Sequence, residues 1–284
     1  MQKKDVYFLA LVEFYKNDGN FESCSFAMLI HLILFKLGDS NGRIRNHAIK
    51  LLNILASDKE EEYWANNYYH PGINSSLFEL SGKVQFNLSI KLANEYPNQA
   101  FELFNEFIYR LDQPSIEFVN QQKMLKILIP WIKKMKLSIL TMNELPEFLQ
   151  NLFWMTVKFI NENVVIKNIM RIWKTLANNE ENISYIIDYI VFLGIHKKNQ
   201  LFIEIAKKVI FYIAITNVKV TINNLINELS TIKILPRSKS ESILQKQKLN
   251  QVSSSESNSF SIELDSNSKL YKIMPDITSY SPPG

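Results

Sequence analysis

Apolar side chains recur every three or four residues from about residue 5 to about residue 232. This spacing places them on one face of an α-helix, because a helix turns once in about 3.6 residues. Polar runs, glycines and prolines divide the pattern into about eleven helices. They are expected at residues 5–17, 25–37, 43–56, 81–96, 98–111, 115–129, 146–161, 164–177, 183–193, 200–216 and 221–232. No segment shows the alternation of a β-strand, so the sequence predicts an all-α fold.

Short connections between consecutive helices predict antiparallel helical hairpins. A single hairpin cannot bury its apolar faces alone, so the hairpins are expected to stack into an α-solenoid. The spacing of helix pairs is about 40 residues, which favours the HEAT/armadillo-like class of repeats. We therefore expect a helical repeat domain over residues 1–235.

The hairpin at residues 29–56 carries the clearest repeat pattern. Asp39 lies in its turn, where we expect it to cap the next helix or to pair with a basic residue of a neighbouring repeat. Arg45 lies at the start of the second helix and is expected to be partly buried and close to a carboxylate. Ala48 is small where the two helices are expected to approach closely. The alternative is an ordinary helical hairpin, which is also all-α.

The composition changes at Pro236. Residues 236–284 are rich in serine and contain few large apolar side chains. Such a segment buries too little surface to offset the entropy lost on ordering. We therefore expect a disordered C-terminal tail.

The usual motifs of catalysis and cofactor binding are missing from the sequence. The most closely spaced glycines, Gly38 and Gly42, lack the Gly-Lys-Ser/Thr ending of a phosphate loop. The four histidines are far apart, and none has another histidine or a cysteine at metal-ligand spacing. The single cysteine, Cys24, excludes a disulfide framework and is interpreted as a small packing residue in a reducing compartment. We therefore expect no enzyme activity, no cofactor, no metal site and no small-molecule substrate.

The net charge of +4 is small and comes without a dense basic run, so it does not indicate nucleic-acid binding. The most apolar stretch, residues 183–193, contains Asp188 and is shorter than the ~20 residues of a transmembrane segment. Three pairs of basic residues form a candidate surface for acidic partners. They are Lys133, Lys134, Lys197, Lys198, Lys207 and Lys208. The alternative is that these lysines are scattered, solvated side chains.

Four segments in collinear order carry a family resemblance. They are QFNLSIKLANEYPNQAFELFNEFIYRLD, QQKMLKILIPWIKKMKL, LQNLFWMTVKFINENVVIKNIMRIWKTLANN and YIIDYIVFLGIHKKNQLFIEIAKKVIFYIA, within residues 85–214. Short motifs inside them, such as Leu128-Ile129-Pro130-Trp131 and Thr156-Val157-Lys158-Phe159, occur in the same order in the Furry / cell-morphogenesis protein family. The chain therefore resembles the central HEAT/armadillo-like region of these very long proteins. The resemblance fades after Lys233.

The resemblance implies a non-enzymatic scaffold that acts with an NDR-family kinase and its Mob co-activator. In that family such scaffolds control polarised growth, cell shape and neurite patterning, and some associate with microtubules. It also implies a cytoplasmic protein at the cell cortex, at sites of polarised growth or on the microtubule cytoskeleton. The alternative function is a generic helical-repeat adaptor for transport or complex assembly.

Overall fold

The computed structural model describes residues 3–18, 25–39, 41–55, 78–112, 118–197 and 200–231. Every regular element in these ranges is a helix, which confirms the all-α prediction. The α-helices are α1 (Lys3–Asp18), α2 (Phe26–Leu37), α3 (Gly42–Leu55), α5 (Phe78–Glu95), α6 (Ala100–Asp112), α7 (Phe118–Ile132), α8 (Glu144–Phe159), α9 (Val165–Ala177), α10 (Glu180–Lys197), α11 (Gln200–Ala214) and α12 (Val218–Thr231). Two short 3₁₀ helices are η3 (Pro97–Gln99) and η4 (Leu137–Ile139). The predicted tail at residues 236–284 lies outside the described residues.

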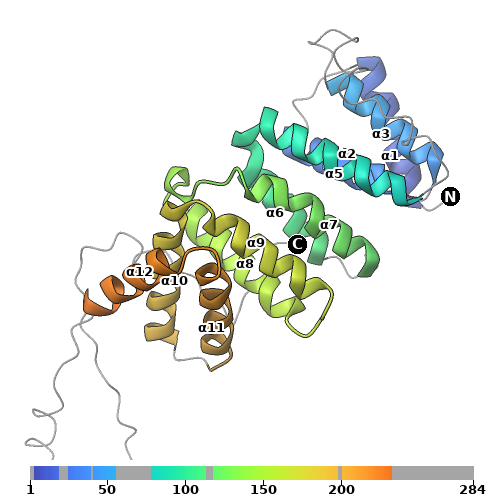
Figure 1. Ribbon diagram of the computed structural model, residues 1–284. Helices are drawn as coiled ribbons and strands as arrows, with labels where there is room; N and C mark the ends of the chain where they lie inside the picture. Colours follow the sequence, from blue (N-terminus) through green and yellow to red (C-terminus); the bar gives the residue numbers. More distant parts are fainter. Residues whose placement is uncertain are drawn as a thin grey trace, which may run out of the picture.

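The helices stack into an elongated body of two layers (Figure 1). In the first layer α5 packs against α7, α7 against α9, and α9 against α11. In the second layer α2, α6, α8, α10 and α12 follow one another in the same way. Contacts between α6 and α7, α8 and α9, and α10 and α11 join the layers, and α3 packs against both α1 and α2 at the N-terminal end. This arrangement is the predicted α-solenoid.

Local hydrogen bonds set where the helices begin. Ser25 is the N-cap of α2, and its hydroxyl oxygen accepts from the Met28 N–H at 3.1 Å. The start of α8 lies two residues before the predicted Pro146. There Thr141 Oγ1 accepts from the Glu144 N–H at 3.3 Å, and Glu144 Oε2 accepts from the Thr141 N–H at 2.8 Å. These reciprocal bonds form a capping box, which extends the helix N-terminally.

Pro130 does not end α7, although the sequence predicted a helix that ends at residue 129. The helix continues to Ile132. Ser89 of α5 contacts this part of α7, since its hydroxyl donates to the Ile127 carbonyl at 2.6 Å and accepts from Trp131 Nε1 at 3.0 Å. Trp131 is fully buried. The neighbouring helix thus anchors the chain on both sides of Pro130.

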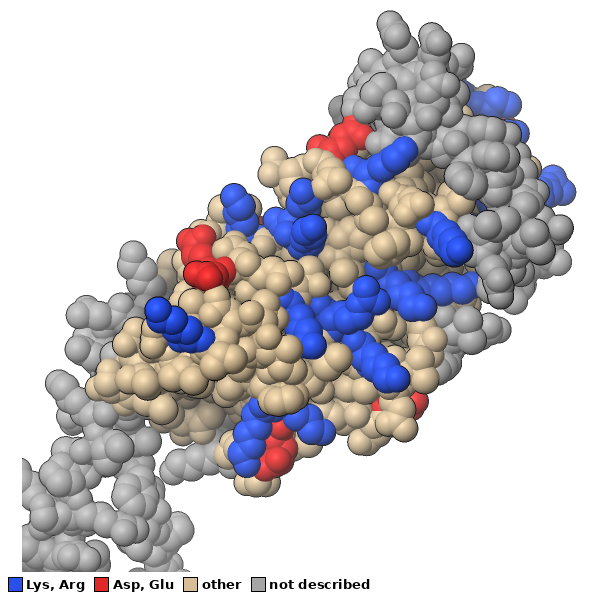
Figure 2. Space-filling view, viewed as in Figure 1, with Lys and Arg blue, Asp and Glu red and all other residues tan. Residues whose placement is uncertain are grey.

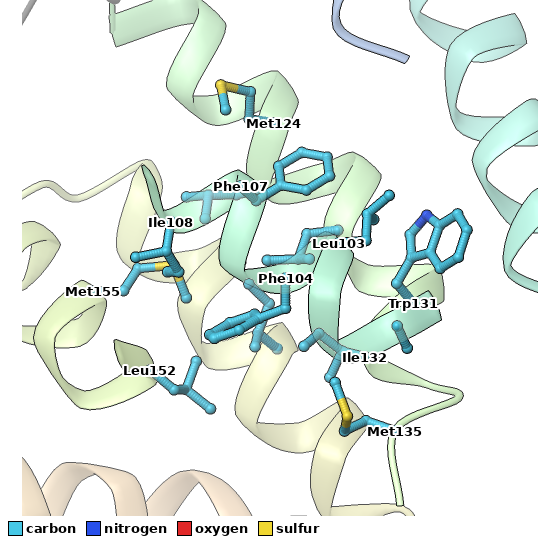
Figure 3. Close-up of a cluster of buried hydrophobic side chains, with 14 of the residues drawn as sticks. Leu103, Phe104, Phe107, Ile108, Met124, Trp131, Ile132, Met135, Leu152 and Met155 are labelled. Atoms are coloured by element: carbon cyan, nitrogen blue, oxygen red, sulfur yellow. The ribbon is translucent and has the colours of Figure 1, made fainter. Parts of the chain in front are cut away.

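The core lies between the two layers and is apolar throughout the described stack. Figure 3 shows one section, where side chains of α6, α7 and α8 meet. Phe104 of α6 stacks obliquely on Phe148 of α8, with ring centroids 4.5 Å apart. Its neighbours in the figure include Leu103, Phe107 and Leu152, which are also buried. Burial of such large side chains is the main source of stability in a solenoid.

Buried polar side chains join helices that are far apart in sequence. Gln85 of α5 donates from Nε2 to the Leu34 carbonyl of α2 at 2.6 Å, and only 3% of its surface is exposed. Gly38 allows this bond, because a Cβ there would lie 2.6 Å from Gln85 Nε2. The backbone of Gly38 has φ −86°, so the glycine is required by the close approach rather than by its backbone conformation.

Asn182 connects three elements in the same way. Its Nδ2 donates to the Met135 carbonyl at 3.1 Å and to the Leu176 carbonyl at 3.0 Å. Its Oδ1 accepts from the Leu137 N–H at 2.8 Å. Residues 182–184 have the Asn-x-Ser sequence of a glycosylation acceptor, but the Asn182 side chain is almost fully buried and so is inaccessible to glycosylation in the folded protein.

Candidate protein-interaction surfaces

The turn between α2 and α3 contains the residues expected from the repeat pattern. Arg45 is buried, and its Nη1 donates to the Asp39 backbone carbonyl at 2.8 Å. Asp39 Oδ1 accepts from the Asn41 N–H at 2.8 Å, and Asp39 Oδ2 lies 3.8 Å from Lys36 Nζ. Asn41 caps α3, since its Oδ1 accepts from the Arg43 N–H at 3.0 Å. The turn is therefore held by its own side chains.

Two further observations relate this turn to its neighbours. Burial lowers the pKa of Lys123 on α7, and the Asp39 carboxylate opposes that shift. The charges of Asp39 and Lys123 therefore interact across the two helices, and pairing of Asp39 with a neighbouring repeat stays a prediction. Ala48 is fully buried on α3, the helix that packs against both α1 and α2. Ala48 therefore lies where α3 contacts its neighbouring helices.

The predicted lysine pairs lie on different parts of the stack. Lys133 is exposed and Lys134 is half-buried, both directly after α7. Lys207 and Lys208 are exposed on α11, and Lys207 Nζ lies 2.9 Å from Glu204 Oε1. That hydrogen bond lowers the pKa of Glu204. The side chains of Lys197 and Lys198 lie outside the described residues. Since α9 packs against both α7 and α11, the described pairs share the first layer but are not adjacent.

The first layer carries a broader basic surface than those pairs. Neither α7 nor α9 contains an aspartate or a glutamate. We define the basic face by six exposed residues of α5, α7 and α9 and the residue after α7: Lys83, Lys91, Lys126, Lys133, Lys167 and Arg171. Figure 2 shows Lys and Arg side chains gathered over the middle of this side of the molecule. A surface of one sign attracts and steers partners of the opposite sign.

Acidic side chains are more numerous in the second layer than in the first, where Glu95 lies on α5 and Glu204 on α11. Those of the second layer are Glu102, Glu106, Asp112, Glu144, Glu147, Glu180, Glu181, Asp188 and Glu228. Burial raises the pKa of Glu147, and the neighbouring Glu144 adds to the shift. Burial raises the pKa of Asp188 to about 6, with a further contribution from Glu228 of α12. The carboxylates are therefore close enough to repel one another, and the two layers differ in sign.

Sequence reasoning missed five residues of the basic face: Lys83, Lys91, Lys126, Lys167 and Arg171. These residues are spread over three helices and none is adjacent to another, so a search for adjacent lysines passes over them. The basic face could have been detected from the net charge of each predicted helix. Taken helix by helix, α7 and α9 are purely basic, whereas α6 and α8 are mainly acidic. Only the alternation of layers turns this difference into two opposite faces.

Most of the described tryptophans have a structural role. Trp131 and Trp173 are fully buried, and Trp173 Nε1 donates to Thr156 Oγ1 at 2.9 Å. Trp154 is half-buried beneath Lys158, whose Nζ lies 4.7 Å from the ring centroid. Lys158 also donates to the Leu111 carbonyl at 2.9 Å, so it joins α8 to the end of α6. This cation–π contact is thus part of the stacking between helices.

The end of the described stack exposes an apolar stripe on α12. Val218, Ile222, Ile226 and Leu229 are each about half exposed or more, at 48–60%. Their spacing of four, four and three residues places them on one side of the helix. Thr221, on another side, is buried. In a solenoid, such a stripe is the surface against which a further helix packs.

Little in the described ranges resembles a catalytic or metal site. No group of three or more His, Cys, Asp or Glu residues there is arranged to hold a metal ion. No helix of those ranges has the length and apolar character needed to cross a bilayer. His31 is buried between Phe107 and Phe35, with ring centroids 4.6 and 6.4 Å away. It is therefore a packing residue, and Cys24 lies outside the described residues.

Two comparisons with known proteins place the chain among cell-morphogenesis proteins. Residues 2–273 match the family described as "Cell morphogenesis central region". The chain is also 23% identical over 192 residues to "Cell morphogenesis protein PAG1" of Saccharomyces cerevisiae. That alignment covers 66% of this chain and 8% of the yeast protein. No solved structure matches the chain. The family match continues past Lys233, where the motif resemblance fades, and so includes much of the serine-rich region.

Proposed function

The chain belongs to the cell-morphogenesis family defined by that central region, and from this premise we propose that it is a non-enzymatic scaffold segment supporting NDR-family kinase signalling. Its partners would be an NDR-family kinase and the Mob co-activator, with microtubules as a further candidate. The processes served would be polarised growth, cell shape and neurite patterning. The corresponding places of action are the cytoplasm, the cell cortex, sites of polarised growth and the microtubule cytoskeleton.

The separation of charge between the two layers is the observation that carries this proposal. The buried residues of the described stack are used in packing helix on helix. What remains accessible is an elongated surface with a basic side and an acidic side. Extended surfaces of this kind suit a protein that holds several partners at once. Complementary charge would fix the orientation in which each partner binds.

Capture of the kinase and its co-activator tests the proposal. The full chain would be immobilised and exposed to a purified NDR-family kinase and to Mob, separately and together. Capture of either one, above the level given by an unrelated helical-repeat protein of similar charge, is the expected result. Failure to capture either partner, alone or as a mixture, would contradict the kinase-scaffold role. A generic adaptor function would then be the better interpretation of the fold.

A further inference from the structure

We propose that the basic face binds an acidic polypeptide segment, rich in aspartate and glutamate, of a partner protein. This inference rests on the proposed scaffold function and specifies the chemistry that one docking partner must have. It assigns the site to Lys83, Lys91, Lys126, Lys133, Lys167 and Arg171.

These six residues form a continuous area. α7 packs directly against α5 on one side and α9 on the other, so their exposed sides adjoin. Neighbouring helix axes lie about 8–10 Å apart, which makes the face about 20 Å wide from α5 to α9. Lys126 and Lys133 are seven residues apart, or about 10 Å along the helix axis. An extended segment of about eight residues, at roughly 3.3 Å each, would span the face.

The residue types favour carboxylates over phosphates. Five of the six residues are lysines, whose ammonium group is a point charge without the planar fork of arginine. Recognition of a phosphorylated residue typically uses a cluster of arginines that bind its oxygens in pairs, and Arg171 is alone here. Nucleic acids would also be expected to stack bases on exposed aromatic rings. Among the described residues of α5, α7 and α9, no aromatic side chain is strongly exposed.

A membrane is also a poor fit for this face. Binding to anionic lipid is strengthened by apolar side chains that enter the interface. Among the described residues of α5, α7 and α9, the exposed large apolar side chains are limited to Ile90, at 38%.

Binding of a synthetic peptide to the full chain tests the proposal. A fluorescent peptide of about ten glutamates is long enough to cross the face. Its affinity would be measured at on the order of 50 mM NaCl, where charges still interact over about 10 Å or more. The test variant is Lys126→Glu/Lys167→Glu/Arg171→Glu. The matched control, Arg43→Glu/Lys50→Glu/Lys219→Glu, changes the net charge equally at exposed positions outside the face.

The expected result is saturable binding that weakens at least ten-fold in the test variant and less than three-fold in the control. A charge-neutral variant, Lys126→Gln/Lys167→Gln/Arg171→Gln, should show an intermediate loss, and circular dichroism should show the same helix content in all four proteins. Binding no tighter than that of a glycine-serine peptide would overturn the proposal. Equal losses in test and control variants would also overturn it, since they would indicate a response to net charge alone.

Other ligand classes serve as competitors. Phosphatidylserine vesicles, a single-stranded oligonucleotide and a phosphoserine peptide would be tested against the same proteins. Tighter binding of any of these at the basic face, with no competition from the glutamate peptide, would refute the acidic-segment assignment. The kinase capture described above is independent of this outcome. If the glutamate peptide does not bind but the kinase or Mob is captured, only the assignment of the basic face is refuted. If the peptide binds but neither the kinase nor Mob is captured, only the kinase role is refuted.

Discussion

Replacing Asn182 by alanine should destabilise the C-terminal half of the stack. The asparagine holds together the segment after α7, the end of α9 and the start of α10 through three hydrogen bonds. Only 1% of its surface is exposed, so water does not reach the groups that it serves. Alanine would remove all three bonds at once and leave a small void.

The magnitude follows from the groups left without this partner. A buried donor or acceptor without a hydrogen bond costs about 1–3 kcal/mol. Three such groups at the low end of that range give a loss of about 3 kcal/mol in the free energy of unfolding. A domain is stable by about 5–15 kcal/mol, so the effect should be large. Asn182→Asp should be at least as harmful, because a carboxylate oxygen would then face the Met135 and Leu176 carbonyls.

Urea unfolding of both variants, followed by circular dichroism and by the fluorescence of buried Trp131 and Trp173, measures the effect. The midpoint should fall in each variant with the slope unchanged. Asn223→Ala is the matched control, since Asn223 is exposed on α12 and its replacement should change stability by less than about 0.5 kcal/mol. A loss below about 1 kcal/mol for Asn182→Ala would refute the argument that these bonds join the hairpins.

Three further predictions concern other parts of the molecule. Gly38→Ala should cost about 1–2 kcal/mol by displacing Gln85, and in urea unfolding its effect should be smaller when Gln85→Ala is also present. Burial lowers the pKa of His31 from 6.5 to about 3, so the folded protein holds the imidazole neutral where the unfolded chain would protonate it. The free energy of unfolding should therefore fall by about 1.4 kcal/mol per pH unit from pH 6.5 toward pH 3, and should not depend on His31 above pH 6.5. In His31→Phe this slope should be reduced in a pH series of unfolding midpoints. A chain ending at Leu235 should keep its thermal midpoint, as the composition of residues 236–284 predicts; a fall would indicate that this region covers the apolar stripe of α12.

The sequence was sufficient to predict where α-helices form, but not where each of them begins and ends. Apolar spacing predicted every described α-helix, because each α-helix must bury one face and the apolar side chains of that face recur with the helical period. It did not predict the 3₁₀ helix η4. Helix ends were less predictable. The start of α8 is set by a reciprocal pair of bonds between Thr141 and Glu144, and the last turns of α7 are bonded to Ser89 of another helix. The second of these is a contact at a sequence separation of 38 residues, which no local pattern contains.

The sequence by itself determined that this protein is an all-α solenoid, since hydrophobic period and the lack of strand alternation are local properties of the chain. It also determined the family, through motifs whose order survives without the structure. Tertiary structure decided how residues on different helices combine. Lys126 and Arg171 belong to one face because α7 packs directly on α9, and Asn182 is a structural joint because three chain segments converge on it. Both properties arise from stacking, which brings together residues that the sequence holds far apart.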